Sequence, residues 1–306
     1  MSTVIAVSTE ALTVRAGVLD VELRRSGDPD GWPVVLLHGF PYDAHSYDRV
    51  AELLARAGAD VVVPSLRGYG GTRFVDATTM RSGQQAALAH DLLELLDALE
   101  LGPAIVAGYD WGGRAACLVA MLWPERVAGL VSCNGYNVLD IAATARPFPP
   151  SVEKRLWYQY YLHTDRGAQG LAQFREEFAR QLWTDWSPQW HFTDADFAAT
   201  AGSFANPDFV DVVVHSYRHR YGTVDGDPSY QATEDRIAGK PAITVPTIVL
   251  DGEQSTIYPP GSRESHGAHF PDLVDHRLVP AGHNVPQEDP AGFSQAILDV
   301  HRRVRR

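Results

Sequence analysis

The chain has 306 residues, which is enough for one large domain or two small ones. Its 26 basic and 38 acidic side chains leave a formal net charge of −12, and 45% of its residues are hydrophobic. An acidic protein repels nucleic-acid phosphates and anionic lipid headgroups, so both are poor candidates for partners. The composition is otherwise that of an ordinary globular protein.

The start of the chain and its cysteines indicate the cellular compartment of the protein. The first residues, Met1 to Ile5, lack the basic segment and long apolar run of an export signal. Cys117 and Cys133 lie in apolar segments without CxxC spacing, which predicts small buried side chains rather than a redox pair or a metal site. We therefore expect a reduced, cytoplasmic protein.

Strand and helix patterns alternate along the first part of the chain. Short apolar runs predict buried strands at residues 33–38, 60–66, 104–109 and 127–134. Leucines at steps of four, three and four predict a long helix over residues 82–101, capped by Ser82, and a second helix is expected over 112–122. This alternation predicts an α/β fold, with a mostly parallel, doubly wound sheet.

The pattern changes between about residues 135 and 241. This segment is rich in aromatic and charged residues and shows no buried-strand run, which predicts a helical lid over one end of the sheet. The alternative is an independent second domain. Two strands and a final helix are then expected, at 247–250, 276–279 and about 291–303. We therefore expect a core of residues 1–134 and 242–306, with a cap of residues 135–241.

A G-x-Asp-x-G motif at residues 108–112 lies between a predicted strand and a predicted helix. Its glycines permit a tight turn that lifts the Asp110 side chain above the sheet. The sequence HGFP at 38–41 closes an earlier predicted strand, and His283 follows the last one. Three such elements, each at the carboxyl end of a strand, predict one catalytic site. The alternative is a helix-capping Asp110 and a structural His283.

These motifs resemble the α/β-hydrolase superfamily along nearly the whole chain. HGFP, Asp-Trp-Gly-Gly and the segment 66–72 (LRGYGGT) resemble most closely the epoxide hydrolases and haloalkane dehalogenases. The resemblance implies that the Asp110 carboxylate forms an alkyl ester and that His283 activates the water that hydrolyses it. The backbone N–H groups of Phe40 and Trp111 would hold the oxyanion. No metal or organic cofactor is implied.

The leaving group separates the two activities. An epoxide oxygen leaves as a basic alkoxide and needs a proton, whereas a halide leaves as a stable anion. The segment WYQYYL resembles the lid segment in which a Tyr-Gln pair carries the first proton donor of epoxide hydrolases, which maps onto Tyr158. The segment HSYR resembles that of the second donor, which maps onto Tyr217. The resemblance thus implies an epoxide hydrolase that yields a vicinal diol; simple aromatic packing is the alternative for both tyrosines.

Two other functions stay open. A haloalkane or haloacid dehalogenase would use the same nucleophile, and the indole N–H of Trp111 could hold its halide. Fluoroacetate dehalogenases resemble the chain too, but they carry His-Trp where Tyr158 and Gln159 stand and an arginine where Trp111 stands. The alternative of another class is a ligand-binding protein on this fold. The expected partners are a small apolar substrate and water, and a homodimer is compatible with the sequence.

The acid that should orient His283 is not evident. The family usually places an aspartate three residues after the glycine that ends the strand before the last, and this chain has Ser255 there. The other common position holds Asn134. Glu253 or Asp251 could reach His283 from a shifted loop, or Asn134 or Ser255 could orient the imidazole without balancing its charge. If the acid is absent, release of the ester is expected to be slow.

Overall fold

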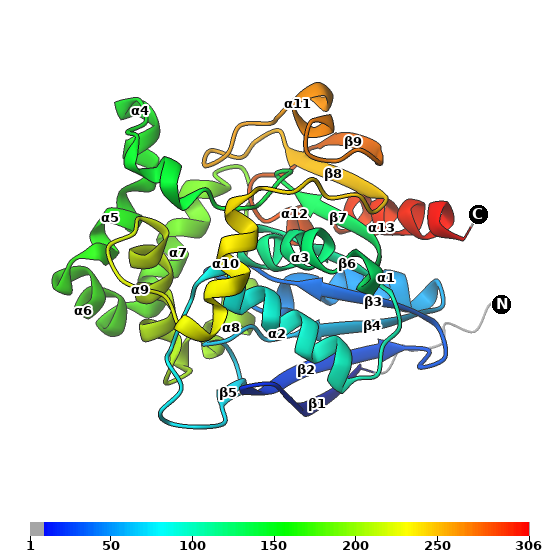
Figure 1. The fold of residues 1–306 in the computed structure, drawn as a ribbon, viewed down its shortest axis with the longest axis horizontal. Coiled ribbons are helices and arrows are strands. Elements are labelled where there is room, and N and C mark those ends of the chain that lie inside the picture. The colour runs from blue at the N-terminus through cyan, green and yellow to red at the C-terminus, as the bar shows by residue number, and fades with distance from the viewer. Residues whose placement is uncertain (1–8, 306) are drawn as a thin grey trace.

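The computed structural model describes residues 9–305 and contains a nine-stranded sheet with helices on both faces (Figure 1). The segment Met1 to Ile5, where no export signal is expected, lies outside the described residues. The strands are β1 (Thr9–Ala16), β2 (Leu19–Gly27), β3 (Trp32–Leu37), β4 (Ala59–Pro64), β5 (Arg73–Phe74), β6 (Ala104–Gly108), β7 (Val127–Cys133), β8 (Thr247–Gly252) and β9 (Leu273–Val279).

The sheet is mostly parallel and runs in the order β1-β2-β4-β3-β6-β7-β8-β9, with β5 paired to β2. The strands from β4 to β9 along this order pair in parallel. In contrast, β1, β2 and β5 form an antiparallel edge. The predicted α/β fold is confirmed. The antiparallel edge was not predicted, because β1 is mostly exposed and β2 alternates buried and half-buried residues, so neither forms a continuous apolar run.

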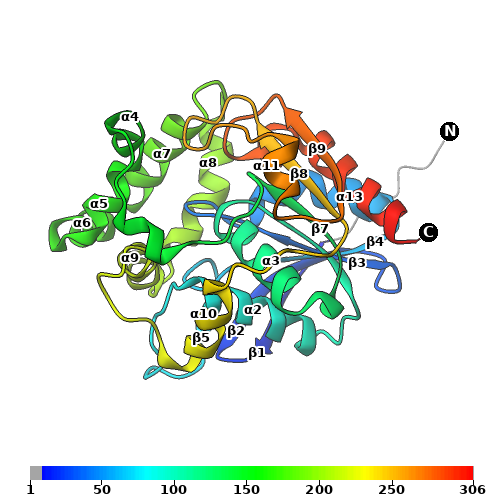
Figure 2. The same ribbon diagram turned by 45° about the horizontal axis from the view of Figure 1, so that its top comes forward.

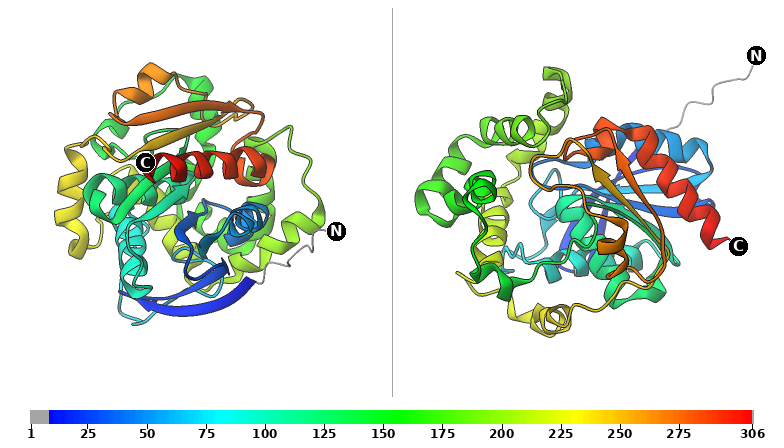
Figure 3. Two further views of the ribbon diagram at one scale, coloured as in Figure 1. Left: turned by 90° about the vertical axis from the view of Figure 1, so that its right-hand side faces the viewer. Right: turned by 90° about the horizontal axis from the view of Figure 1, so that it is seen from above.

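Helices from the core segments cover both faces of the sheet. On one face α1 (Asp48–Arg56) packs against α13 (Pro290–Val304), and on the other α2 (Gln85–Ala98) packs against α3 (Asp110–Leu122) (Figure 3). The helix predicted from Ser82 begins three residues later, because the Ser82 hydroxyl accepts the Gln84 N–H in the preceding turn. The helix predicted from Gly112 begins at Asp110 instead.

The segment between β7 and β8 is helical. It forms η3 (Ile141–Ala145), α4 (Pro150–Glu153), η4 (Lys154–Leu156), α5 (Trp157–His163), α6 (Asp165–Gln173), α7 (Arg175–Trp186), α8 (Asp194–Ala201), η5 (Gly202–Ala205), α9 (Phe209–Arg220), η6 (Pro228–Tyr230) and α10 (Gln231–Ala238). Figure 2 shows α4 to α9 gathered at one end of the sheet. The indole N–H of Trp183 on α7 donates to Pro41 O at 2.8 Å, so this segment packs on the loop that follows β3.

The remaining elements are short connections: η1 (Ala44–Tyr47), η2 (Pro124–Arg126), α11 (Arg263–Gly267) and α12 (Val285–Glu288). Cys117 and Cys133 are free and buried, as expected. None of the helices within residues 9–305 has both the length and the hydropathy of a membrane span.

Candidate active site

The strand-to-helix turn at Asp110 has the geometry that its glycines permit. Asp110 has a φ of 50°, in the left-handed region that side chains other than glycine adopt only at some energetic cost. A Cβ atom on Gly112 would lie 2.1 Å from Leu37 O, so no larger residue fits where the helix crosses β3. The turn therefore presents Asp110 at the carboxyl end of β6, as the motif predicts.

The loop after β3 contacts the Asp110 carboxylate directly. The Phe40 N–H donates to Asp110 Oδ1 at 2.8 Å. A Cβ atom on Gly39 would lie 2.5 Å from the Cβ of Asp110, so glycine is needed for this approach. Trp111 is the second residue of α3, and N–H groups in the first turn of a helix have no intrahelical acceptor. The Phe40 N–H thus contacts the carboxylate, and the Trp111 N–H belongs to a helical turn whose N–H groups are free to bind another acceptor.

His283 lies on the other side of the same carboxylate. Its Nε2 is 3.6 Å from Asp110 Oδ2, and the imidazole is 1% exposed. The Trp186 ring packs edge-on against it, with centroids 5.0 Å apart. The imidazole position thus depends on an aromatic side chain from the helical segment as well as on the loop after β9.

The Asp110 carboxylate is ionised at neutral pH. Burial by itself would raise the pKa of Asp110, but His283, Arg114 and the Phe40 N–H outweigh it and hold this pKa below its ordinary value. The residue keeps 8% of its surface accessible, so a water-sized molecule reaches it. The site therefore combines a charged carboxylate with an adjacent imidazole.

Two tyrosines from the helical segment complete the site. Tyr158 on α5 and Tyr217 on α9 are 2% and 1% exposed, and their ring centroids are 5.3 Å apart. The Tyr217 ring lies 5.4 Å from the Phe40 ring and 6.1 Å from the Trp111 ring. Burial raises the pKa of both phenols well above 10, so both stay protonated. The structure thus brings all six predicted site residues together.

The group that should orient His283 is still missing. Among residues 9–305, the Nδ1 atom of His283 has no hydrogen-bond partner. The Glu253 side chain is exposed, and the Ser255 hydroxyl instead accepts the Tyr258 N–H at 3.3 Å. Asn134 has a φ of 62° at the end of β7 and makes no hydrogen bond to the imidazole.

Asp251 contacts two other histidines. Its Oδ2 lies 2.9 Å from the Nε2 atoms of both His266 and His276, and it also accepts the Gly261 N–H. Within the described chain, this is the one group of acidic, histidine or cysteine side chains close enough to share a metal ion. Since hydrogen bonds already satisfy the carboxylate oxygen, the group fits a structural role without an ion.

The comparison with protein families agrees with this geometry. Residues 33–290 match the model of the alpha/beta hydrolase fold. The chain belongs to the α/β-hydrolase family.

Several relatives of this α/β hydrolase carry names that bear on its chemistry. Epoxide hydrolase B of Mycobacterium tuberculosis is 34% identical over 152 residues, 46% of this chain but only 42% of that protein. A fluoroacetate dehalogenase of Burkholderia sp is 36% identical over 136 residues, 43% of this chain and 42% of that protein. A Klebsiella pneumoniae crystal structure, provisionally named an epoxide hydrolase, is 46% identical with a TM-score of 0.93, over 96% of this chain and 97% of that one. The chain is therefore epoxide hydrolase-like and has dehalogenase relatives.

The α/β-hydrolase site includes positioning residues that the sequence reading missed. The Ser187 hydroxyl accepts the His283 N–H at 2.8 Å and donates to Glu288 Oε1 at 2.6 Å. The same carboxylate accepts the N–H groups of Gly282 and Asn284, at 2.6 and 3.0 Å. Glu288 thus holds the turn that carries the imidazole. Its place five residues after the histidine is the only signal the sequence offers.

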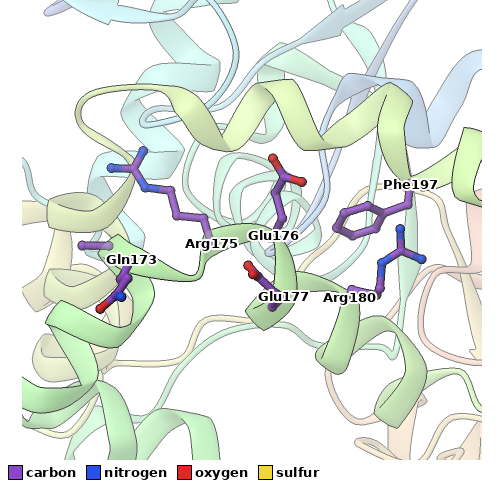
Figure 4. A pocket seen from close by; sticks show the side chains of 7 residues that line it. Gln173, Arg175, Glu176, Glu177, Arg180 and Phe197 are labelled. Atoms are coloured by element: carbon purple, nitrogen blue, oxygen red, sulfur yellow. The ribbon is translucent and has the colours of Figure 1, made fainter.

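A hollow on the surface of this α/β hydrolase is lined by residues other than those of the candidate site. Figure 4 shows that Arg175, Glu176, Glu177 and Arg180 of α7 line it together with Phe197. None of the six predicted site residues takes part. The Arg180 guanidinium lies 4.2 Å from the centre of the Phe197 ring, so local contacts account for this arrangement.

Proposed function

We propose that this α/β hydrolase opens epoxides to vicinal diols through an ester on Asp110. The observation that carries the proposal is the pair of buried, protonated tyrosines beside a buried, ionised carboxylate. A carboxylate that attacks a saturated carbon forms a stable alkyl ester, whereas attack on an acyl carbon gives a reactive anhydride. The two tyrosines supply the proton that an epoxide oxygen requires.

In the first step, one Asp110 oxygen attacks an epoxide carbon and the carbon–oxygen bond of the strained ring breaks. A phenol proton passes to the departing oxygen. The Gln159 amide donates to the Tyr158 hydroxyl oxygen at 2.8 Å, so the hydroxyl proton is free to point at the substrate. The same amide hydrogen bond stabilises the phenolate that remains. Gln159 is itself held by the Tyr221 hydroxyl, at 2.8 Å.

In the second step, His283 takes a proton from a water that attacks the ester carbonyl carbon of Asp110. The Phe40 and Trp111 N–H groups stabilise the oxyanion, and its collapse breaks the ester carbon–oxygen bond and expels the product as an alkoxide. The alkoxide takes the proton of the imidazolium, and the proton left on the re-formed Asp110 carboxyl group returns to the phenolate. The 3.6 Å between imidazole and carboxylate puts the proposed base next to the carbonyl group that the water attacks. Without an acid at His283 Nδ1, we expect this step to limit turnover.

We further propose that residues 135–241 act as a cap that supplies the proton donors and excludes water. Tyr158, Tyr217 and Trp186 all come from this segment and surround the groups of the core. Removal of water strengthens hydrogen bonds to the leaving oxygen. The substrate and water thus react away from bulk solvent.

Dehalogenation is the second candidate, because one observation favours it. The indole Nε1 of Trp111 is buried, and no acceptor for it exists among residues 9–305. A halide leaving Asp110 would accept that N–H. Two tyrosines would then have no role as acids, which is why we rank this function second.

The test is turnover of a styrene-oxide-like epoxide beside a bromoalkane of similar size. We expect diol from the epoxide, slow or no halide release, and loss of both activities in Asp110→Asn. Circular dichroism of the variant would establish that it is folded. Halide release without diol formation would replace our proposal with a dehalogenase, and reversible binding without either product would indicate a binding protein.

A further inference from the structure

Two buried arginines lie at the candidate site without an acid partner. Arg114 is one helical turn after Asp110 on α3, and Arg220 is the last residue of α9, one turn after Tyr217. They are 4% and 5% exposed. Within the described chain, the Nε atom of each has no hydrogen-bond partner, and neither guanidinium forms an ion pair.

Such an arrangement is costly, since a guanidinium does not lose its proton and a buried charge needs a counter-charge. The chain satisfies another buried arginine in full: Arg67 donates twice to the Asp91 carboxylate, at 2.6 Å each, and once to Ser82 O. The absence of any such partner at Arg114 and Arg220 therefore distinguishes this part of the molecule.

The two buried guanidinium groups are not equivalent. Burial and the positive charge of Arg220 lower the pKa of Arg114 to about 10. The pKa of Arg220 is raised, because Tyr217, Tyr258 and Asp110 outweigh the effect of its burial. The charge of Asp110 acts on both arginines. The Arg220 guanidinium lies 4.8 Å from the centre of the Tyr217 ring, which holds it beside the proposed proton donor.

The reaction does not remove this imbalance. Before it, one carboxylate faces two guanidinium groups, so one positive charge is left over. When Asp110 becomes an ester, the phenol that gives up its proton becomes a phenolate, so one negative charge still faces the two arginines. An anionic group on the substrate balances the site through the whole cycle, and the planar fork of arginine suits a carboxylate.

We propose that Arg114 and Arg220 bind a carboxylate of the substrate, so that the enzyme selects epoxides that carry an acid group. This inference rests on the proposed function and narrows its substrate class. It replaces the small apolar substrate that the aromatic cap suggested. The arginines fix the charged end of the molecule, while Asp110 meets the epoxide carbon.

Binding tests the inference without requiring turnover. In the unreactive Asp110→Asn variant, calorimetry would compare oxirane-2-carboxylate with its neutral amide, which has the same carbon skeleton. We expect the carboxylate to bind at least tenfold more tightly. Equal binding of acid and amide would overturn the inference.

Arginine variants show which side chain causes the preference for the acid over the amide. Adding Arg220→Met is expected to remove most of the tenfold difference between acid and amide. Arg218→Met is the matched control, because Arg218 lies on the same helix but contacts Leu162 O and Asp165. Loss of the preference in both variants, or in neither, would contradict the assignment. The comparison of acid with amide needs no arginine variant, so it remains decisive if Arg220→Met fails to fold.

Turnover of the unmodified enzyme separates the two proposals. Faster diol formation from the acid than from the amide supports both. Equal rates with both substrates would refute the carboxylate subsite and leave the epoxide hydrolase standing. Tight binding of the acid without diol formation would refute the activity and leave the subsite standing.

Discussion

Asp110 combines a left-handed backbone, an N–H donor at 2.8 Å and an imidazole at 3.6 Å in one buried carboxylate. The motif around it was enough to predict this residue, because glycines at a strand–helix junction have few other uses. His283 and the two tyrosines could be predicted only through resemblance. The unpaired Arg114 and Arg220 could not be predicted, because nothing in a sequence shows that a charged side chain is buried without a partner.

At the residue scale, Tyr158→Phe and Tyr217→Phe are each expected to lower epoxide turnover by about 100-fold, the usual contribution of a general acid. Halide release from a bromoalkane should not change, since it requires no proton. Tyr160→Phe is the control, because this tyrosine on the same helix α5 is 39% exposed. Full epoxide turnover in the double variant would show that neither phenol is the acid.

Sequence patterns predicted some strands and turns better than others. Strands buried on both faces, such as β4 and β6, form continuous apolar runs and were predicted. The antiparallel edge strands β1 and β2 have one face toward solvent, and their weaker alternation was missed. The turn before α12 depends on Glu288, whose role arises from side-chain hydrogen bonds that no periodicity encodes.

At the element scale, Glu288→Gln is expected to loosen the turn that carries His283. The amide has one acceptor oxygen instead of two and loses charge-assisted hydrogen bonds, at a cost of about 1–3 kcal/mol in unfolding free energy. We expect a lower kcat with little change in KM, measured beside thermal unfolding. Glu264→Gln, an exposed acid on α11, should alter neither. Unchanged stability and kcat in Glu288→Gln would contradict this role.

At the scale of the whole molecule, polar contacts join the helical segment to the core. Thr200 on α8 donates to Asp43 Oδ1 at 2.8 Å, and Arg81 forms an ion pair with Asp208 at 2.8 Å. The sequence indicated that a helical insertion exists and where the sheet resumes, because sheet patterns stop and return. It could not indicate these contacts, because they join residues more than 100 positions apart in the chain.

The stability that the contact between Asp43 and Thr200 contributes should depend on pH. Burial raises the pKa of Asp43 to about 6, from an ordinary 3.8, so the folded state holds this proton more tightly than the unfolded state. Its contribution to stability is therefore full below about pH 4 and is lost as the pH rises through 6, by about 3 kcal/mol at most. Asp43→Asn keeps the acceptor oxygen but cannot titrate.

Urea unfolding of both proteins between pH 4 and 7 isolates this contribution. The unfolding free energy of the unmodified protein, minus that of Asp43→Asn, should fall across this range. The difference removes the effects of all other titrating groups. A difference that stays constant with pH would show that Asp43 does not titrate there.

The most direct test of the central claim, an ester on Asp110, is a single turnover in water labelled with heavy oxygen. With enzyme in excess over epoxide, the oxygen added to the product comes from Asp110, since water attacks the ester carbonyl carbon and not the substrate. We predict an unlabelled diol and label in the peptide that contains Asp110. Labelled diol in the first turnover, with an unlabelled Asp110 peptide, would show that water attacks the epoxide directly and would contradict the account.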